Sequence, residues 1–293
     1  MNTLSAREGF IRFQDYRTFY KVIGDLDRIP LGKIPVLAIH GRPVSHLALK
    51  PLERLAEFGR PIIFYDQLGC GRSDRPDNPE MWTINLFVEE VTEIRRQLSL
   101  DRVHLIGHSW GGVVAMENAL RNIQEIKSLI LSSTYCDSSV FDSNLDSLRK
   151  KLPAEVYETL LRHETAGTTE DPEYKQADKV FILKHVCRVD PWPNYLDQSL
   201  EHQPVGKVNT EGWTIRARLN AIDIPTLVTC GRYDFCTPAH AEIIHSSIPG
   251  SKLVIFEGSS HYAHIEETDR YIDVLDEFLS LVELNEINKA NDL

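Results

Sequence analysis

The sequence has few cysteines, no long apolar run and no recognisable leader. Only five cysteines occur among 293 residues, and they are scattered, with no C-x-x-C pair. Disulfide frameworks and zinc sites use clustered or regularly spaced cysteines, which argues against both. No stretch approaches the ~18 apolar residues of a membrane span, and Met1 to Arg12 has no apolar signal-peptide core. We therefore expect a cytoplasmic protein with reduced thiols, no zinc and no membrane association.

Basic residues are outnumbered by acidic ones. The chain has 32 Lys and Arg against 43 Asp and Glu, for a formal net charge of −11. A protein that follows a nucleic-acid backbone needs a basic surface, so we expect no nucleic-acid partner. The 42% hydrophobic and 26% charged residues are ordinary for a globular protein that buries a sizeable core.

Short apolar runs alternate with amphipathic stretches along most of the chain. The runs are continuous, which is typical of parallel strands buried on both faces. Between them, Thr83–Leu98 and Ile265–Val282 show helical spacing, and Thr83 is a suitable N-cap. This alternation predicts an α/β fold with a mostly parallel sheet and helices on both faces, preceded by an antiparallel hairpin over Phe10–Gly24. The expected strands are Pro35–His40, Pro61–Asp66, Val103–Gly107, Lys127–Ser133, Pro225–Gly231 and Lys252–Glu257.

The strand pattern is interrupted between about Cys136 and Arg216. Short helical segments joined by polar and proline-containing turns occupy this stretch. We interpret residues 137–215 as a helical cap inserted into a core formed by residues 1–136 and 216–293. The segments expected to be helical are Leu145–Leu152, Glu155–His163 and Tyr174–Arg188. The polar tail Glu283–Leu293 is expected to be disordered.

A G-x-S-x-G motif, GHSWG at 107–111, follows the expected strand residues 103–106 and opens a helical segment. A nucleophile elbow needs this strand–turn–helix context, because the serine must lie on a tight turn with its hydroxyl facing a cleft. The helix N-terminus supplies the Trp110 N–H and a favourable dipole to an oxyanion. The motif predicts Ser109 as a nucleophile, with His108 packed beneath the site rather than catalytic.

A serine nucleophile needs a base and a group that orients the base. Asp234 and His261 each follow an expected strand, at the sheet edge that also carries Ser109, where open α/β sheets bind ligands. The order Ser, Asp, His is that of α/β-hydrolases. His264 as a rival base and Asp66 as a rival acid are weaker alternatives, since His264 begins a helix and Asp66 lies in a turn-rich loop.

Several segments resemble the proline iminopeptidase group of α/β-hydrolases, which includes aminopeptidases and L-amino-acid amidases. The resemblance implies that Ser109 is the nucleophile, His261 the base and Asp234 its orienter, with the Trp110 N–H in the oxyanion hole. It implies no metal and no cofactor. The segments that carry it are YDQLGCGRS at 65–73, LIGHSWGG at 105–112, PTLVTCGRYDFCTP at 225–238, and Ser260-His261.

The sequence departs from this group at three places. The oxyanion loop of the group reads H-G-G-P-G, but residues 40–44 read HGRPV. The Arg42 N–H is the expected second oxyanion donor, whereas its side chain either points to solvent or binds an anionic substrate group. Phe235 replaces the acidic residue that follows the triad aspartate in the group. The cap glutamate that holds the substrate amine falls near Gln203, with Glu201 as a possible substitute.

The expected pocket is apolar and aromatic. Phe235 and Tyr262 flank the predicted triad residues, Gly41 lies in the oxyanion loop, and Trp192 belongs to the cap. We expect a serine hydrolase that forms an acyl-enzyme from a small-molecule or short-peptide substrate. The first hypothesis is an aminopeptidase or amino-acid amidase. The second is a hydrolase of a small ester, lactone or amide without a free amine, such as a specialised-metabolite tailoring enzyme. The third is a non-hydrolytic catalyst or binding protein on this fold.

Overall fold

The computed structural model describes residues 5–121, 125–201, 205–206 and 208–291. Its eight-stranded sheet has the order β1-β2-β4-β3-β5-β6-β7-β8. The β1–β2 and β2–β4 pairs are antiparallel and all other pairs are parallel, which confirms the predicted fold class. The strands are β1 Ala6–Phe13, β2 Tyr16–Ile23, β3 Val36–Ile39, β4 Ile62–Tyr65, β5 Val103–His108, β6 Ile126–Ser132, β7 Thr226–Gly231 and β8 Lys252–Phe256.

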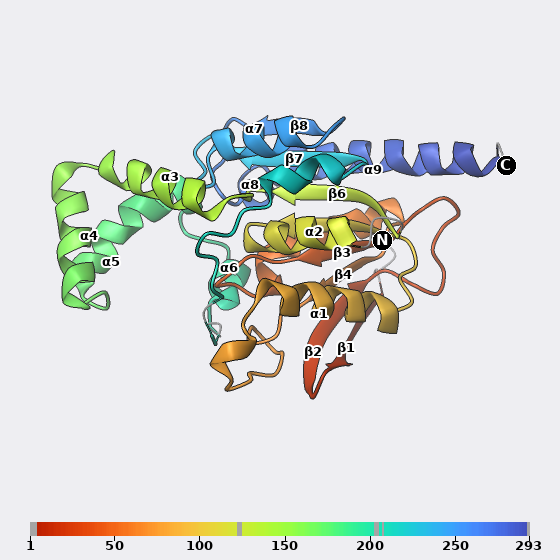
Figure 1. The fold of residues 1–293 in the computed structure, drawn as a ribbon, viewed down its shortest axis with the longest axis horizontal. Coiled ribbons are helices and arrows are strands. Elements are labelled where there is room, and N and C mark those ends of the chain that lie inside the picture. The colour runs from red at the N-terminus through yellow and green to blue at the C-terminus, as the bar shows by residue number, and fades with distance from the viewer. Residues whose placement is uncertain (1–4, 122–124, 202–204, 207, 292–293) are drawn as a thin grey trace.

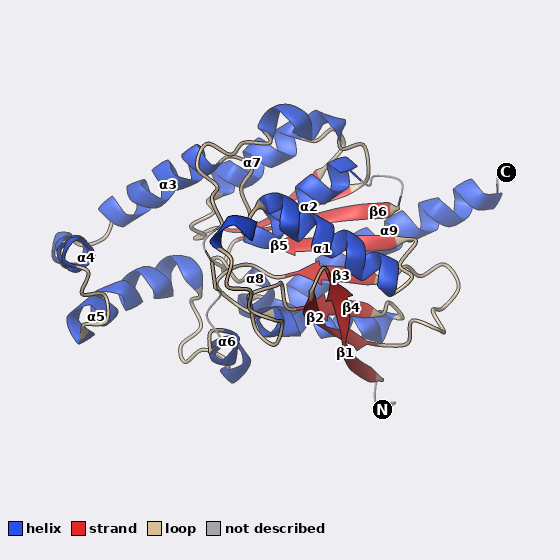
Figure 2. Cartoon of the chain, turned by 60° about the horizontal axis from the view of Figure 1, so that its bottom comes forward, coloured by secondary structure: helices blue, strands red, loops and turns tan. Residues whose placement is uncertain are grey.

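Helices cover both faces of the sheet (Figure 2). Thr83 caps α1 as predicted, because its side chain accepts a hydrogen bond from the Leu86 N–H. The long helices of the sheet layers are α1 Ile84–Gln97, α2 Trp110–Arg121, α7 Pro238–Ser247 and α9 Thr268–Asn291, with the shorter α8 Ala263–Glu266. The 3₁₀ segments are η1 His46–Phe58, η2 Pro79–Met81 and η4 Arg216–Ala221.

The buried apolar side chains form a separate cluster on each face of the sheet. One cluster joins the sheet to α1, α2, η4 and α7, and includes Phe87, Val113 and Ile244. The other joins it to η1 and α9, and includes Leu52 and Leu275. The central strands β3, β4, β5 and β7 are buried throughout, as continuous apolar runs require.

The segment between β6 and β7 forms helices and no sheet strand within its described residues. They are α3 Ser138–Lys150, α4 Ala154–Ala166, α5 Pro172–Phe181, the π-helical η3 Ile182–Val186 and α6 Asn194–Ser199. Helices α3, α4 and α5 extend away from the sheet, whereas α6 contacts η1 (Figure 1). The two ends of the segment meet, because Asp137 bridges Thr214 and the Ser138 N–H donates to the Trp213 carbonyl.

The prediction for the C-terminal tail is wrong. Helix α9 continues to Asn291, and Glu283 is buried against Arg60, which donates two hydrogen bonds of 2.8 Å to its carboxylate. The polar residues of the tail therefore extend an amphipathic helix. Its residue Glu283 pairs with Arg60, which lies 223 positions earlier in the sequence. The hairpin is confirmed but begins earlier than expected, at Ala6.

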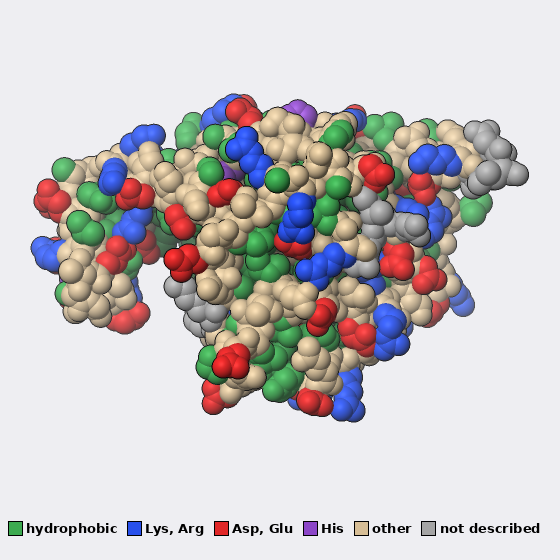
Figure 3. All heavy atoms as spheres, viewed as in Figure 1, with side chains coloured by type: hydrophobic (Ala, Val, Ile, Leu, Met, Phe, Trp, Pro, Cys, Tyr) green, Lys and Arg blue, Asp and Glu red, His purple; other side chains and the backbone are tan. Residues whose placement is uncertain are grey.

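The surface view is consistent with the charge balance. Acidic and basic side chains are interspersed over the face in Figure 3, rather than separated by sign. None of the helices in the described ranges is long and apolar enough to cross a membrane.

Candidate active site

The strand–turn–helix junction at Ser109 has the geometry of a nucleophile elbow. Ser109 lies between β5 and α2 with a φ of 55°, in the left-handed region that L-residues rarely adopt. A Cβ on Gly107 would lie 2.3 Å from the Gly111 carbonyl oxygen, and a Cβ on Gly111 would lie 2.2 Å from the Ile39 carbonyl oxygen. Only glycine allows these backbone segments to approach so closely, which explains the spacing of the motif.

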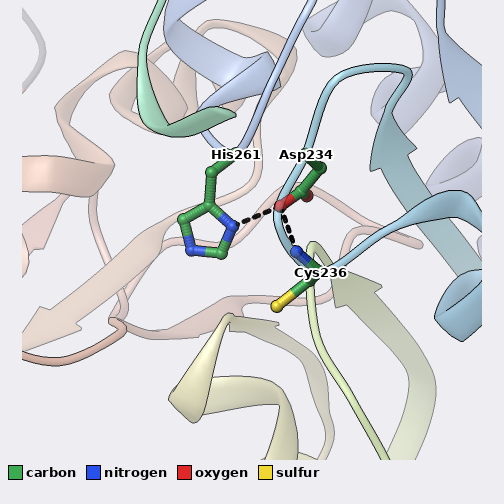
Figure 4. A group of neighbouring side chains, drawn as sticks. All are labelled: Asp234, Cys236 and His261. Carbon is green, nitrogen blue, oxygen red and sulfur yellow. Dashed lines mark hydrogen bonds and ion pairs between the residues drawn. The ribbon is translucent and has the colours of Figure 1, made fainter. Parts of the chain in front are cut away.

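Asp234 and His261 form a buried hydrogen-bonded pair at the ends of β7 and β8. Nδ1 of His261 lies 2.8 Å from Oδ1 of Asp234, and the same oxygen accepts the Cys236 N–H at 2.7 Å (Figure 4). With Nδ1 donating to the carboxylate, Nε2 is the ring nitrogen left free to accept a proton. The Phe235 ring stacks on His261 at 4.0 Å, and Phe235 lines the same cavity as Ser109.

The rival groups occupy other positions. Nε2 of His264 bonds the Ala48 carbonyl at 3.0 Å, and burial lowers the pKa of this ring to about 4. The Asp66 carboxylate accepts bonds from His46 and from the Arg72 N–H, and so shapes its own loop.

His108 is packed beneath the elbow, as its sequence position suggested. Its ring is buried, with Nε2 2.9 Å from the His261 carbonyl oxygen, and burial lowers its pKa well below the usual range. It therefore supports the backbone of His261 as a neutral ring.

Two backbone N–H groups lie where an oxyanion hole is expected. Those of Arg42 and Trp110 make no hydrogen bond to another residue in the described part of the chain. Gly41 lies directly against the elbow, because a Cβ there would be 2.9 Å from the Ser109 Cβ. The Gln67 side chain joins the two segments that carry these N–H groups, accepting from Trp110 Nε1 at 2.8 Å and donating to the His40 carbonyl at 2.6 Å.

The comparisons with known proteins agree on one family. A family model described as the alpha/beta hydrolase fold matches residues 34–268. A proline iminopeptidase of Heyndrickxia coagulans is 37% identical over 270 residues, which cover 86% of this chain and 92% of that protein. The crystal structure of a Mycobacterium smegmatis proline iminopeptidase superposes with a TM-score of 0.86 at 31% identity, covering 96% of this chain and 100% of that one. The crystal structure of VinJ also gives a TM-score of 0.86, at 33% identity, covering 94% and 99% of the two chains.

The chain belongs to the proline iminopeptidase group of α/β-hydrolases. It is a serine hydrolase, as the elbow motif and the resemblance predicted.

The Arg42 side chain distinguishes this serine hydrolase from the H-G-G-P-G loop of its group. Its Nη2 donates to the carbonyl oxygens of Val205 and Gly206 at 3.2 and 3.1 Å. The guanidinium carbon lies 5.4 Å from the centre of the Phe87 ring, within cation–π range. The side chain is therefore held at the active-site cavity and does not extend freely into solvent.

The cavity at Ser109 has a volume of about 370 Å³ and a mainly apolar and aromatic lining. The expected residues Arg42, Trp110 and Phe235 are among those that line it. Sequence reasoning missed the other lining residues. Tyr135 could have been predicted, because it follows β6 at the same sheet edge as Ser109, where open α/β sheets bind ligands. The missed lining residues are Pro43, Tyr135, Phe141, Gly206, Val208 and Thr210.

The remaining expected contacts lie elsewhere. Tyr262 is buried against both the His108 and the His261 rings, and Trp192 packs against the apolar cluster that contains Tyr262. Glu201 is exposed after α6, and does not line the cavity. Gln203 lies outside the described residues.

The end of η3 holds the loops that carry Asp234 and His261. The Val186 carbonyl accepts the His261 N–H at 3.1 Å, and the His185 carbonyl accepts the Phe235 N–H at 3.3 Å. Nδ1 of His185 lies 2.7 Å from the Tyr233 carbonyl oxygen. The end of η3 is thus hydrogen-bonded on both sides of the Asp234–His261 pair.

Proposed function

We propose that this serine hydrolase is an aminopeptidase that removes an N-terminal residue from a short peptide or amino-acid amide. The observation that carries the proposal is the Asp234–His261 pair beside the cavity that contains Ser109. The names of its relatives as proline iminopeptidases, at 37% identity in one case, support an amide bond next to a free amine as the substrate.

In the proposed mechanism, Ser109 Oγ attacks the carbonyl carbon while His261 Nε2 takes the serine proton. Asp234 holds the imidazole in the required tautomer and stabilises the imidazolium. The oxyanion is held by the N–H groups of Trp110 and Arg42. His261 then protonates the leaving amine, and water, activated by the same ring, hydrolyses the acyl-enzyme.

We further propose that residues 137–215 are a cap on a core of residues 1–136 and 216–293. The hydrogen bonds of Val186 to His261 and of His185 to Phe235 support a cap that helps to position the triad loops. A cytoplasmic location is supported by the cysteines, which are all buried free thiols.

The test is hydrolysis of alanyl and prolyl p-nitroanilides, each with a free and with an acetylated α-amine. Ser109→Ala is the blank. The proposal predicts turnover of the free-amine compounds alone, with loss of activity in the variant. Equal turnover of the acetylated compounds would refute recognition of the amine.

The cavity lining favours a second candidate. None of the lining residues named above carries a carboxylate, and Phe235 takes the place of the acidic residue expected to follow Asp234. Without a counter-charge, a substrate ammonium loses a charged hydrogen bond that contributes about 1.5–3 kcal/mol. The second candidate is therefore a hydrolase of a small ester, lactone or amide without a free amine, and preference for the acetylated compounds would identify it.

A further inference from the structure

Arg42 presents an incompletely paired cation at the wall of the active-site cavity. Its Nη2 is bonded to two carbonyl oxygens, but its Nη1 is shielded from solvent and has no hydrogen-bond partner among the residues that the structure describes. A guanidinium offers five N–H donors in a planar fork that matches a carboxylate. A buried donor left unpaired is unfavourable, and Arg42 also lines the cavity that contains Ser109, so an anion bound in this cavity would supply a counter-charge to the guanidinium.

The surroundings of Arg42 do not neutralise its charge. Arg42 forms no ion pair within the part of the chain that the structure describes. The nearby Glu90 is buried, and burial raises the pKa of its carboxyl to about 8, so it is mostly uncharged at neutral pH. The His40 ring is also neutral there, since burial lowers its pKa to about 4. The cavity therefore combines apolar and aromatic walls with one unneutralised cation.

The contacts on Nη2 also define the direction of the fork. Two carbonyl bonds and the Phe87 ring fix the guanidinium plane, so little rotamer freedom remains to be lost when an anion binds. A side chain fixed in this way discriminates between substrates better than a mobile one.

We propose that Arg42 is a specificity-determining residue that binds a carboxylate of the substrate beside the reacting carbonyl. The proposal rests on the proposed function, and it narrows the substrate to an amide that carries a negative charge near the scissile bond. The carboxylate has two possible sources. It is either the free α-carboxylate of the leaving amino acid, as in a dipeptide, or the side chain of an acidic N-terminal residue.

The test compares ligands that differ only in this charge. One pair is alanyl-phenylalanine and its C-terminal amide, and the other is the p-nitroanilides of glutamate and glutamine. Their dissociation constants are measured on Ser109→Ala, and kcat/KM on the wild-type enzyme. Both measurements are repeated with Arg42→Gln, which removes the charge but retains a donor for the carbonyl bonds, and with Arg42→Lys. Arg12→Gln, at a side chain that is 78% exposed, is the charge-matched control.

In at least one pair, we expect the charged member to bind about tenfold more tightly or more, the size of a charge-assisted hydrogen bond. Arg42→Gln abolishes this preference, Arg42→Lys retains part of it, and Arg12→Gln leaves it unchanged. The pair that responds identifies the source of the carboxylate. Equal dissociation constants within both pairs, or a preference that survives Arg42→Gln, would overturn the proposal. Charge-dependent binding without Ser109-dependent hydrolysis would instead overturn the proposed function alone.

Discussion

Asp234→Asn separates the two roles of the proposed triad acid, its charge and its hold on the imidazole. In the structure one carboxylate oxygen, Oδ1, accepts both His261 Nδ1–H and the Cys236 N–H, at 2.8 and 2.7 Å. The other, Oδ2, faces the Cys230 thiol at 3.7 Å. An asparagine that keeps its oxygen at the Oδ1 position retains both hydrogen bonds and loses only the negative charge.

The Cys236 N–H determines whether the oxygen or the nitrogen of the side-chain amide in Asp234→Asn faces His261. If the amide turned its nitrogen toward His261, the Cys236 N–H would face another donor and lose its partner. A buried donor without a partner costs about 1–3 kcal/mol, and 1.4 kcal/mol is a factor of ten. The oxygen therefore remains on His261 in most molecules. The expected loss is that of a charge-assisted hydrogen bond, about 1.5–3 kcal/mol, or about 10- to 100-fold in kcat.

The assay is kcat and KM on the p-nitroanilide that the wild-type enzyme hydrolyses best, with the exposed Asp223→Asn as the matched control. Loss of the tautomer would give a decrease nearer 10⁴-fold, the size observed when a triad aspartate is replaced by asparagine and the imidazole takes the wrong tautomer. A 10⁴-fold decrease would refute the orienting role of the Cys236 N–H. An unchanged kcat would refute the role of Asp234.

Three further predictions concern the elbow and the C-terminal helix. Gly111→Ala places a methyl group 2.2 Å from a backbone carbonyl oxygen and is expected to lower the free energy of unfolding by about 1–3 kcal/mol and to reduce kcat. Gly258→Ala is the control, because its methyl group would meet only the end of the Glu267 side chain, at 3.3 Å. Equal losses of unfolding free energy in Gly111→Ala and Gly258→Ala, measured by urea denaturation, would contradict this reasoning. Arg60→Met leaves the buried Glu283 carboxylate without its bidentate partner and is expected to lower the free energy of unfolding by about 3–5 kcal/mol. The surface control Arg54→Met is expected to lower it by less than about 1 kcal/mol. Similar urea midpoints for the two variants would be evidence against this role of Arg60. Burial alone would raise the pKa of Glu283, but its hydrogen bonds lower it from 4.5 to about 2, so its contribution to stability is complete above pH 4.5 and is lost as the pH falls toward 2. This acid-dependent loss of stability is expected to be smaller in Arg60→Met than in the wild type. An identical pH dependence of the unfolding free energy in both proteins would count against the pairing of Glu283 with Arg60.

The parallel sheet and the elbow were predictable because their signals are local. Continuous apolar runs specify strands buried on both faces, and the spacing of Gly107 and Gly111 around Ser109 reports a close backbone approach that only glycine allows. Asp234 and His261 were predictable for a related reason. Each follows a strand, and parallel strands bring their carboxyl ends to one edge of the sheet.

The remaining features depend on contacts between distant residues. The tail is polar by composition, but it continues α9 because Glu283 meets Arg60 across 223 positions. The Arg42 guanidinium is held by carbonyls more than 160 positions along the chain, a contact that the residues around Arg42 do not report. Tyr262 is next to His261 in sequence, yet it packs edge-on against the His261 ring outside the cavity lining, since successive residues point in different directions.

Active-site labelling tests the central claim, that Ser109 is the nucleophile of this serine hydrolase, most directly. The protein is treated with a fluorophosphonate, and the labelled residue is identified by mass spectrometry while residual p-nitroanilide hydrolysis is followed. The account predicts one adduct per chain, on Ser109, with activity lost in proportion to labelling and no adduct in Ser109→Ala. Activity that survives complete labelling of Ser109, or an adduct on another residue that tracks the loss of activity, would contradict it.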